Sequence, residues 1–469
     1  MKSRRRLIAR LLLLLALCYA AAAVLPYAFP VPVDPDFQQR FSAAAFYGDG
    51  SLSGPDRAGY IPDPREAFAL RLSLIESARE QIILSSHSTQ KGQTPDLLWG
   101  ALLDAADRGV SVRILLDSLF GGLGHGATAL ALDSHPNIEL YYFNPLRLLR
   151  PHTANSRLHD KYFIVDGSVM LLGGRNISDA YFAPDGYTGP VSHDNDVLVW
   201  HTGAGRSVIA DVTAYFESAR AHELTEPAFG PLSARQQARA QARAGELRAL
   251  YHSFGAPSPV TPARLEALTV PTDRISLISN PFTGLPKQPL ILWQLLQLAG
   301  DSRTGVLFQS PYTVVGGPVY RQLAALAGQK EVCLLTNSLA STPNPPAFSA
   351  YLWDRTALAR AGLTIYEYQS EDSIHGKSVL IDDRLSAVGS WNLDERSIAI
   401  DTEVMLVIDS APFQQLLRQR YDSIIARSLV VGEDGRYLPG AAEALPVPPL
   451  KKGLYHALSV LTHLFRFLI

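Results

Sequence analysis

From about residue 64 onward, the chain alternates between segments with helical spacing of apolar positions and short apolar runs typical of buried strands. In the first half, helices and strands are predicted in turn at 65–79, 81–85, 96–108 and 110–117, followed by a strand at 137–143. The second half repeats this order at 289–298, 305–310, 319–328, 331–337, 348–361 and 362–368. Strands separated by helices indicate an α/β fold with a mixed or parallel sheet in each half.

In each half the alternation ends in the same polar pattern. Residues 159–176 read HDKYFIVDGSVMLLGGRN, and residues 375–392 read HGKSVLIDDRLSAVGSWN. In both segments, Lys stands two positions after His, Asp stands five positions after Lys, Gly stands seven positions after Asp, and Asn stands three positions after Gly. The apolar run between Lys and Asp predicts a buried strand, and the run after the Asp predicts its hairpin partner, which returns the Asn toward the His and Lys.

His and Lys two positions apart on a strand point to one face. A Lys beside a His disfavours a divalent cation and favours an anion, so no metal or other cofactor is expected. Brought face to face, the two copies would surround one pocket. This set suits displacement at a phosphodiester: one His attacks phosphorus, the other protonates the leaving oxygen, and Lys and Asn hold the charged oxygens. The six residues are His159, Lys161, Asn176, His375, Lys377 and Asn392.

The duplicated HxKxxxxD motif followed by G-[GS]-x-N resembles the phospholipase D superfamily. The resemblance implies two α/β sandwich domains related by a pseudo-twofold axis, with the active site at their junction. It also implies a phosphohistidine intermediate, with His159 as nucleophile and His375 as general acid, and it adds Ser390 to the substrate-binding asparagines. Family usage counts Asp166 and Asp382 with the catalytic signature, although their place at a strand end favours bracing of the turn.

Further acids follow each motif. The segments HDNDV at 193–197 and IDTEV at 400–404 align as acid-x-acid-Val. In the family, an acid here hydrogen-bonds the motif His and sets its tautomer, as the Asp of a catalytic triad does. By position the resemblance assigns this role to Asp196 and Glu403; the alternative is a pair of exposed acids at a strand edge.

Several local segments resemble the bacterial cardiolipin synthase branch of this superfamily: FNPLRLLRP, LHDK and GGRNISDAYF around the first motif, TNSLAST at 336–342, and HGK with GSWNLDERS around the second. The resemblance implies transfer of a phosphatidyl group between phospholipids. Trp391 and a short segment at 150–157 depart from the branch and leave the acceptor open. The alternatives are phospholipase D-type hydrolysis, an exported phosphodiesterase or nuclease, and an idle lipid-binding protein, which the complete motif disfavours.

Composition narrows the class of partner. The chain has 469 residues, of which 47% are hydrophobic and 18% charged, enough for two globular domains. A formal net charge of −2 offers no general attraction to nucleic acid. The two cysteines, Cys18 and Cys333, define no disulfide framework. The resemblance to cardiolipin synthases implies phospholipids and a membrane surface as partners, no nucleic acid is expected, and the oligomeric state stays open.

The N-terminus indicates export. A basic cluster precedes an apolar stretch at 11–25, which fits a secretory signal better than a full span, with cleavage positions at 20–23. An uncleaved anchor is the alternative. In either case the positive-inside bias predicts a location at the bacterial cell membrane, with the catalytic domains facing the periplasm or exterior.

The predicted organisation has five parts: a signal peptide or anchor at 1–30, a first domain at 31–230, a connecting helix and linker at 231–265, a second domain at 266–445, and a C-terminal amphipathic helix at 446–469. The Ala- and Arg-rich segment 232–252 is interpreted as a solvated connecting helix rather than a nucleic-acid-binding one. The last helix presents Leu454, Leu458, Leu461, Phe465 and Leu468 on one face, for either a membrane surface or domain packing.

Overall fold

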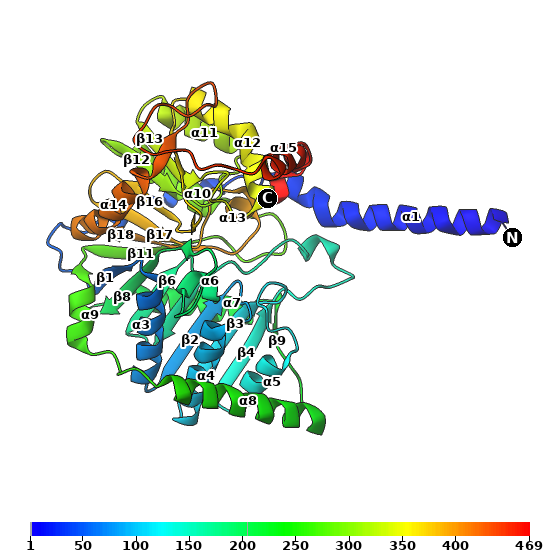
Figure 1. Cartoon of the computed structure of the whole chain (residues 1–469), viewed down its shortest axis with the longest axis vertical. Helices are drawn as coiled ribbons and strands as arrows, with labels where there is room; N and C mark the ends of the chain where they lie inside the picture. Colours follow the sequence, from blue (N-terminus) through cyan, green and yellow to red (C-terminus); the bar gives the residue numbers. More distant parts are fainter. Residues whose placement is uncertain (1, 204) are drawn as a thin grey trace.

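The computed structural model describes residues 2–203 and 205–469. It contains two large mixed sheets, one in each half of the chain, stacked with helices between and around them (Figure 1). The predicted α/β fold with two phospholipase D-type domains is confirmed. A single apolar helix, α1 (Lys2–Val24), projects away from this body (Figure 1).

The two sheets have the same strand order. The first runs β10 (Val270–Pro271), β1 (Asp56–Ile61), β8 (Asp196–His201), β6 (Val169–Gly173), β5 (Tyr162–Val165), β2 (Gln81–Ser86), β3 (Ser111–Asp117), β4 (Ile138–Phe143) and β9 (Thr225–Pro227). The second runs β11 (Arg274–Ser279), β18 (Val404–Asp409), β17 (Leu385–Gly389), β16 (Ser378–Ile381), β12 (Gly305–Gln309), β13 (Glu331–Asn337), β14 (Thr364–Tyr368) and β19 (Ser428–Val430). Apart from the extra edge strand β10, each strand has a counterpart. In both sheets three neighbouring strands are parallel, β2 to β4 and β12 to β14, and the motif hairpin is antiparallel. The halves are therefore repeats of one topology.

Helices cover the sheets as the apolar spacing predicts. The first half contributes α3 (Pro64–Ser77), α4 (Gln93–Asp107), α5 (Ala127–Asp133), α6 (Asp179–Phe182), α7 (Val208–Ala221) and α8 (Ala234–Phe254). The second contributes α9 (Pro262–Leu268), α10 (Leu290–Gly300), α11 (Gly317–Ala327), α12 (Pro345–Arg360), α13 (Glu395–Ala399), α14 (Ala411–Ile425) and α15 (Pro449–Leu464). Short helices η1 (Leu25–Ala28), α2 (Pro35–Arg40), η2 (Ala43–Phe46), η3 (Pro151–Thr153) and η4 (Arg466–Leu468) lie in the connections.

Alternate side chains of the motif strands enter different cores. Phe163 packs into the outer core of the first half, whereas its neighbour Ile164 packs into a core shared by both halves. That shared core includes Phe216 of α7 and Phe413 of α14, together with side chains from both sheets such as Leu380. The two halves are thus joined by apolar packing, and the motif strands lie at their junction.

Backbone pairing also joins the halves next to the motif histidines. The short strands β7 (Ser192–His193) and β15 (Ser373–Ile374) pair in parallel, directly before His375. Leu158 forms an isolated bridge with Thr402, directly before His159. Each motif histidine therefore follows a segment that is hydrogen-bonded to the opposite half.

Two peripheral segments pack differently from the predicted division. Phe46 lies in the outer core of the second half, and the Phe41 ring centroid is 5.0 Å from that of Trp293 on α10, so residues 41–46 pack on the second domain rather than opening the first. α8 is solvated on one face only, because Leu247 and Tyr251 on its other face are buried in the first domain's outer core.

The C-terminal helix packs on the protein body, as one of its two predicted roles requires, but with only one of its faces. α15 buries Tyr455 and Thr462 and packs on α12, whereas Leu454, Leu461 and Phe465 stay exposed. Its apolar face is therefore free beside the packing face.

Candidate active site

A pocket of about 620 Å³ lies at the junction of the two halves. The strand ends of both motif hairpins open into it, because His159 and His375 stand just before β5 and β16. Both histidines and both motif asparagines, Asn176 and Asn392, line this one pocket. The fold therefore brings together side chains that are more than 200 positions apart in the sequence.

Each motif histidine is hydrogen-bonded to a carboxylate from the opposite half. His159 Nδ1 is 2.8 Å from Oε1 of Glu403, and His375 Nδ1 is 2.5 Å from Oδ2 of Asp194. Both carboxylates are fully buried. A bond at Nδ1 orients the ring and leaves Nε2 for the chemistry.

The prediction that Asp196 orients a histidine is wrong. Its carboxylate binds Arg71 at 2.9 and 3.0 Å and Arg175 at 2.8 Å, so its charge is already compensated inside the first half. Strand register explains the error. Gly173 pairs with Asp196, whereas the equivalent Gly389 pairs with Met405, which makes Asp194 the counterpart of Glu403. The acid-x-acid-Val alignment is displaced by two residues.

Ser390 supports a carboxylate instead of facing the pocket. Its hydroxyl donates to Oε2 of Glu403 and accepts from the backbone N–H of Val404 at 3.1 Å, and the side chain is buried. The predicted substrate contact is therefore replaced by a contact that holds Glu403 against His159.

The two lysines lie beside their histidines, buried in the junction. Lys161 Nζ donates to the backbone oxygen of His159, and Lys377 Nζ lies 3.1 Å from Nε2 of His375. Burial lowers the pKa of Lys161 to about 8 and that of Lys377 to about 7. An entering anion would favour the ammonium form of both side chains.

Burial also governs the charge of the histidines. It lowers the pKa of His159 well below its ordinary value, with a further decrease from the Lys161 charge. It lowers the pKa of His375 to about 4, although Asp194 acts in the opposite direction. Both imidazoles are thus neutral at pH 7 without substrate.

The two orienting carboxylates differ. Despite burial, the nearby Lys377 and His375 hold the pKa of Asp194 below its usual value. Burial raises the pKa of Glu403 well above its usual value, although Lys161 and Ser390 oppose this. The carboxylate beside His375 is therefore the more stable anion of the two.

The asparagines carry unused hydrogen-bonding capacity. In the part of the chain that the structure describes, Oδ1 of Asn176 and Oδ1 of Asn392 are buried without a partner, and Asn176 Nδ2 donates to the Tyr181 hydroxyl at 3.1 Å. Buried polar groups are normally paired, so each of these acceptor oxygens is available to a hydrogen-bond donor of a ligand, such as a hydroxyl group.

Asp166 and Asp382 lie at the opposite ends of the motif strands and do not line the pocket. Both adopt left-handed backbone conformations, with φ of 49° and 54°. The Asp166 carboxylate accepts the backbone N–H groups of residues 79–81, and the Asp382 carboxylate accepts those of residues 303 and 304. These contacts brace the turn that closes each motif strand.

Several pocket residues had no sequence motif. His87, after β2, lies with its ring centroid 4.7 Å from that of His159. Tyr181 and Tyr312 present ring edges to His375 at 5.1 and 6.0 Å. The position of His87 at the carboxyl end of a parallel strand was the one available signal. Arg157 and Arg396 also line the pocket. Across residues 2–203 and 205–469, no group of three or more His, Cys, Asp or Glu side chains is arranged to hold a metal ion.

Comparisons with known proteins agree on one family. The family described as "Cardiolipin synthase, PLD-like domain" matches residues 72–220 and 295–425. Cardiolipin synthase C of Escherichia coli K12 is 30% identical over 405 residues, covering 78% of this chain and 85% of that protein. The major cardiolipin synthase of Bacillus subtilis is 24% identical over 382 residues, covering 79% and 66%. Phosphatidylserine synthase of Haemophilus influenzae shares the fold, with a TM-score of 0.61 at 14% identity over 91% of this chain and 100% of that one. The chain therefore belongs to the cardiolipin synthase family of phospholipase D-like proteins and is an enzyme of the phospholipase D superfamily.

Proposed function

We propose that this enzyme transfers a phosphatidyl group from one phospholipid to the headgroup alcohol of another, forming cardiolipin through a phosphohistidine. One observation carries the proposal: two histidines, each bonded through Nδ1 to a buried carboxylate of the opposite half, share one pocket with two asparagines. Paired histidines supply a nucleophile and an acid, and the cationic and amide groups match a phosphodiester.

In the first step, Nε2 of His159 attacks phosphorus, and the bond from phosphorus to the headgroup oxygen breaks. His375 gives its proton to that oxygen, so an alcohol leaves. In the second step, neutral His375 takes the proton of the acceptor hydroxyl, whose oxygen attacks phosphorus as the phosphorus–nitrogen bond breaks. Lys161 and Lys377 balance the charge on the phosphoryl oxygens in both steps.

The carboxylates support this assignment of the histidines. Asp194, the more stable anion, favours an imidazolium at His375, as a general acid requires. Attack through Nε2 of neutral His159 requires its proton on Nδ1, where the Glu403 carboxylate accepts it. The negative phosphodiester itself raises the pKa of the nearby His375 on binding.

We also propose that α1 is retained as a membrane anchor, with the catalytic halves facing the periplasm. The segment Arg4–Ala28 has 25 residues and contains an 18-residue window with a mean hydropathy of 2.4, which is long and apolar enough to cross a bilayer. Its end is attached to the fold: Ala23 accepts a hydrogen bond from Asn155 at 2.7 Å, and Tyr27 donates to the His152 carbonyl at 2.6 Å. A cleaved signal would have no need of these contacts.

A leucine-rich loop supports the same orientation. Leu148 is 80% exposed and Leu149 is 97% exposed, between Arg147 and Arg150. The loop precedes η3, which contacts α1, so it lies on the anchor side of the body (Figure 1). Exposed leucines flanked by arginines fit the boundary between lipid headgroups and acyl chains.

The test is product analysis with the full chain in phosphatidylglycerol nanodiscs. Cardiolipin and glycerol are expected from the wild type, and no product from His159→Ala. His252→Ala, at a half-exposed position far from the pocket, is the matched control and should retain activity. Phosphatidic acid as the sole lipid product would instead establish hydrolysis, and cleavage of nucleic acid without lipid turnover would establish the nuclease alternative.

A further inference from the structure

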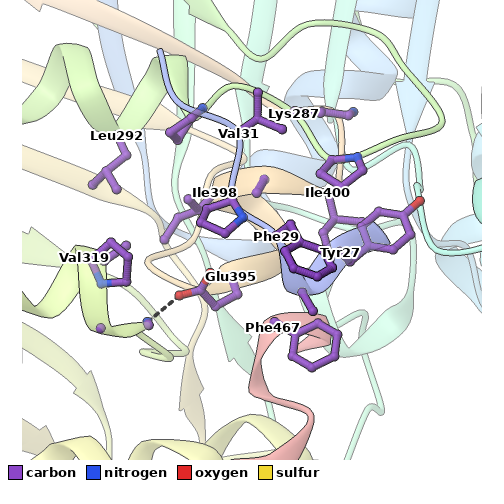
Figure 2. Close-up of a pocket in the computed structure, with 18 of the residues that line it drawn as sticks. Tyr27, Phe29, Val31, Lys287, Leu292, Val319, Glu395, Ile398, Ile400 and Phe467 are labelled. Atoms are coloured by element: carbon purple, nitrogen blue, oxygen red, sulfur yellow. Dashed lines mark hydrogen bonds between the residues drawn. The ribbon is translucent and has the colours of Figure 1, made fainter. Parts of the chain in front are cut away.

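A second cavity, of about 740 Å³, lies beside the catalytic pocket and has no part in the chemistry above. Residues 27–33, at the end of the anchor segment and just beyond it, form one wall. Side chains of α10, α11 and α13 and of the C-terminal turn η4 form the others (Figure 2). The cavity therefore begins where the chain leaves the membrane.

Its lining is predominantly apolar. Figure 2 shows Phe29, Leu292, Val319, Ile398 and Phe467 around the same space. Phe29 forms part of the cavity wall, and yet its side chain is 70% exposed. An open apolar cavity of this size is typical of a binding site for an apolar ligand.

The polar groups at the cavity are paired unequally. Glu395 accepts the backbone N–H of Gly316 (Figure 2). Lys287 is buried, and the charges of Asp401 and Asp160 oppose the effect of burial on its ammonium group, but in the described residues its Nζ, like Nδ1 of His463, has no hydrogen-bond partner. The lining therefore offers two unpaired nitrogen atoms in addition to its apolar side chains.

A thin wall separates this cavity from the catalytic pocket. Within α13, Glu395 and Ile398 line the cavity, whereas Arg396 and Ser397 line the catalytic pocket. At the C-terminal turn, Phe467 lines the cavity and the next residue, Leu468, lines the catalytic pocket. The two spaces therefore lie on opposite sides of the same turn of helix.

We propose that this cavity binds an acyl chain of the phospholipid whose phosphate occupies the catalytic pocket. The proposal rests on the phosphatidyl transfer proposed above and adds its lipid-tail site. The occupant follows from three features: the cavity opens at the foot of an apolar helix, its lining is apolar, and it shares a wall with the phosphate pocket. A lipid leaving the bilayer beside α1 would meet residues 29–33 first.

The first experiment locates the chain. A phosphatidylglycerol with a photoreactive diazirine near the end of one acyl chain is incorporated into nanodiscs with the full-length enzyme and irradiated. Peptide mapping is expected to find adducts in residues 286–293 and 316–322. Adducts confined to α1 and to the loop at 146–149 would overturn the proposal.

The second experiment fills the cavity mouth. Gln322 is exposed on α11 and lines the cavity, and its neighbour Arg321 is exposed but does not line it. Gln322→Trp should raise KM for dioleoyl phosphatidylglycerol about tenfold, a loss of binding shared by ground and transition states. It should leave kcat/KM for a soluble p-nitrophenyl phosphodiester unchanged, and Arg321→Trp should change neither. Equal effects of the two variants would contradict the acyl-chain site.

The two proposals fail in distinguishable ways. Labelling needs binding but no turnover, so adducts at 286–293 and 316–322 without any lipid product would support the cavity as an acyl-chain site and refute phosphatidyl transfer. Cardiolipin formation with labelling absent from these segments would support phosphatidyl transfer and refute the acyl-chain site.

Discussion

Glu403, from the second half of the chain, holds His159 of the first half through a 2.8 Å hydrogen bond to its Nδ1. Asp194 and His375 form the reciprocal pair. Neither half therefore contains both members of a pair between a motif histidine and its orienting carboxylate. Loss of contact between the halves would leave both imidazoles unoriented, even with each sheet intact.

Replacement of Asp194 by Asn should lower kcat about 10²- to 10⁴-fold, because the amide no longer favours the productive imidazole tautomer or an imidazolium. The pH profile of the residual activity should also change, since Asp194 raises the pKa of His375 toward its ordinary value. Single-turnover kinetics across pH would measure both effects. A wild-type profile in this variant would show that Asp194 has only a structural role.

Asp196→Asn serves as the comparison, two residues away. It removes the buried counter-charge of Arg71 and Arg175, so we expect a stability loss of about 3–5 kcal/mol. Denaturant unfolding in detergent would measure it. The pH profile of the folded fraction should match the wild type. A shifted profile with unchanged stability would restore Asp196 as an orienting residue.

The pH dependence of kcat/KM should reflect the buried lysines. Protonated Lys377 and Lys161 are needed to hold the phosphodiester, and their lowered pKa values of about 7 and 8 mean that these charges are lost as pH rises through that range. Activity on a soluble phosphodiester should therefore fall above about pH 7. The acid limb reflects protonation of the nucleophile His159, and it should lie below the ordinary range of a histidine because burial lowers the pKa of His159. An alkaline limb near pH 10 would contradict this assignment.

The histidine roles can be separated with a good leaving group. His375→Ala should still form a phosphoenzyme slowly from a p-nitrophenyl donor, since p-nitrophenolate needs little protonation. His159→Ala should form none. Intact-mass spectrometry would detect the adduct, and its presence in His159→Ala but not in His375→Ala would reverse the assignment.

The leucine loop should matter for lipid substrates alone. Leu148→Asp should weaken vesicle binding of a variant lacking residues 1–30 and lower turnover of lipid in vesicles, while turnover of a soluble phosphodiester stays constant. Leu438→Asp, at an exposed leucine of the second half, is the control. Equal vesicle binding by all three proteins would exclude this loop as a membrane contact.

Chelation tests the expectation of a metal-independent reaction. EDTA should leave turnover unchanged, because the proposed mechanism draws its positive charge from Lys161 and Lys377. Loss of activity on chelation, restored by one divalent ion, would refute that mechanism.

The fold and the motif pocket were predictable because their signals are local and duplicated. Apolar runs of strand length and two HxKxxxxD segments at identical internal spacing required no knowledge of distant contacts. The identity of Asp194 as an orienting residue depended on strand register, because two acids near the start of β8, Asp194 and Asp196, satisfied the same pattern. Ser390 was misassigned because its partner, Glu403, comes from another strand. His87 and Tyr312 carry no motif, and only tertiary packing places them beside the histidines.

The repeated strand order has a consequence for which histidine acts as the nucleophile. Two identical domains in a symmetric dimer would give both histidines the same surroundings, and either could act as nucleophile. Within one chain the two repeats differ at positions that would be identical in a symmetric dimer. Asp194 holds the ring of His375, whereas Glu403 holds the ring of His159. Gly174 in the first repeat corresponds to Ser390 in the second. Fusion of the two domains thus allows a division of labour that a dimer of identical subunits could not encode.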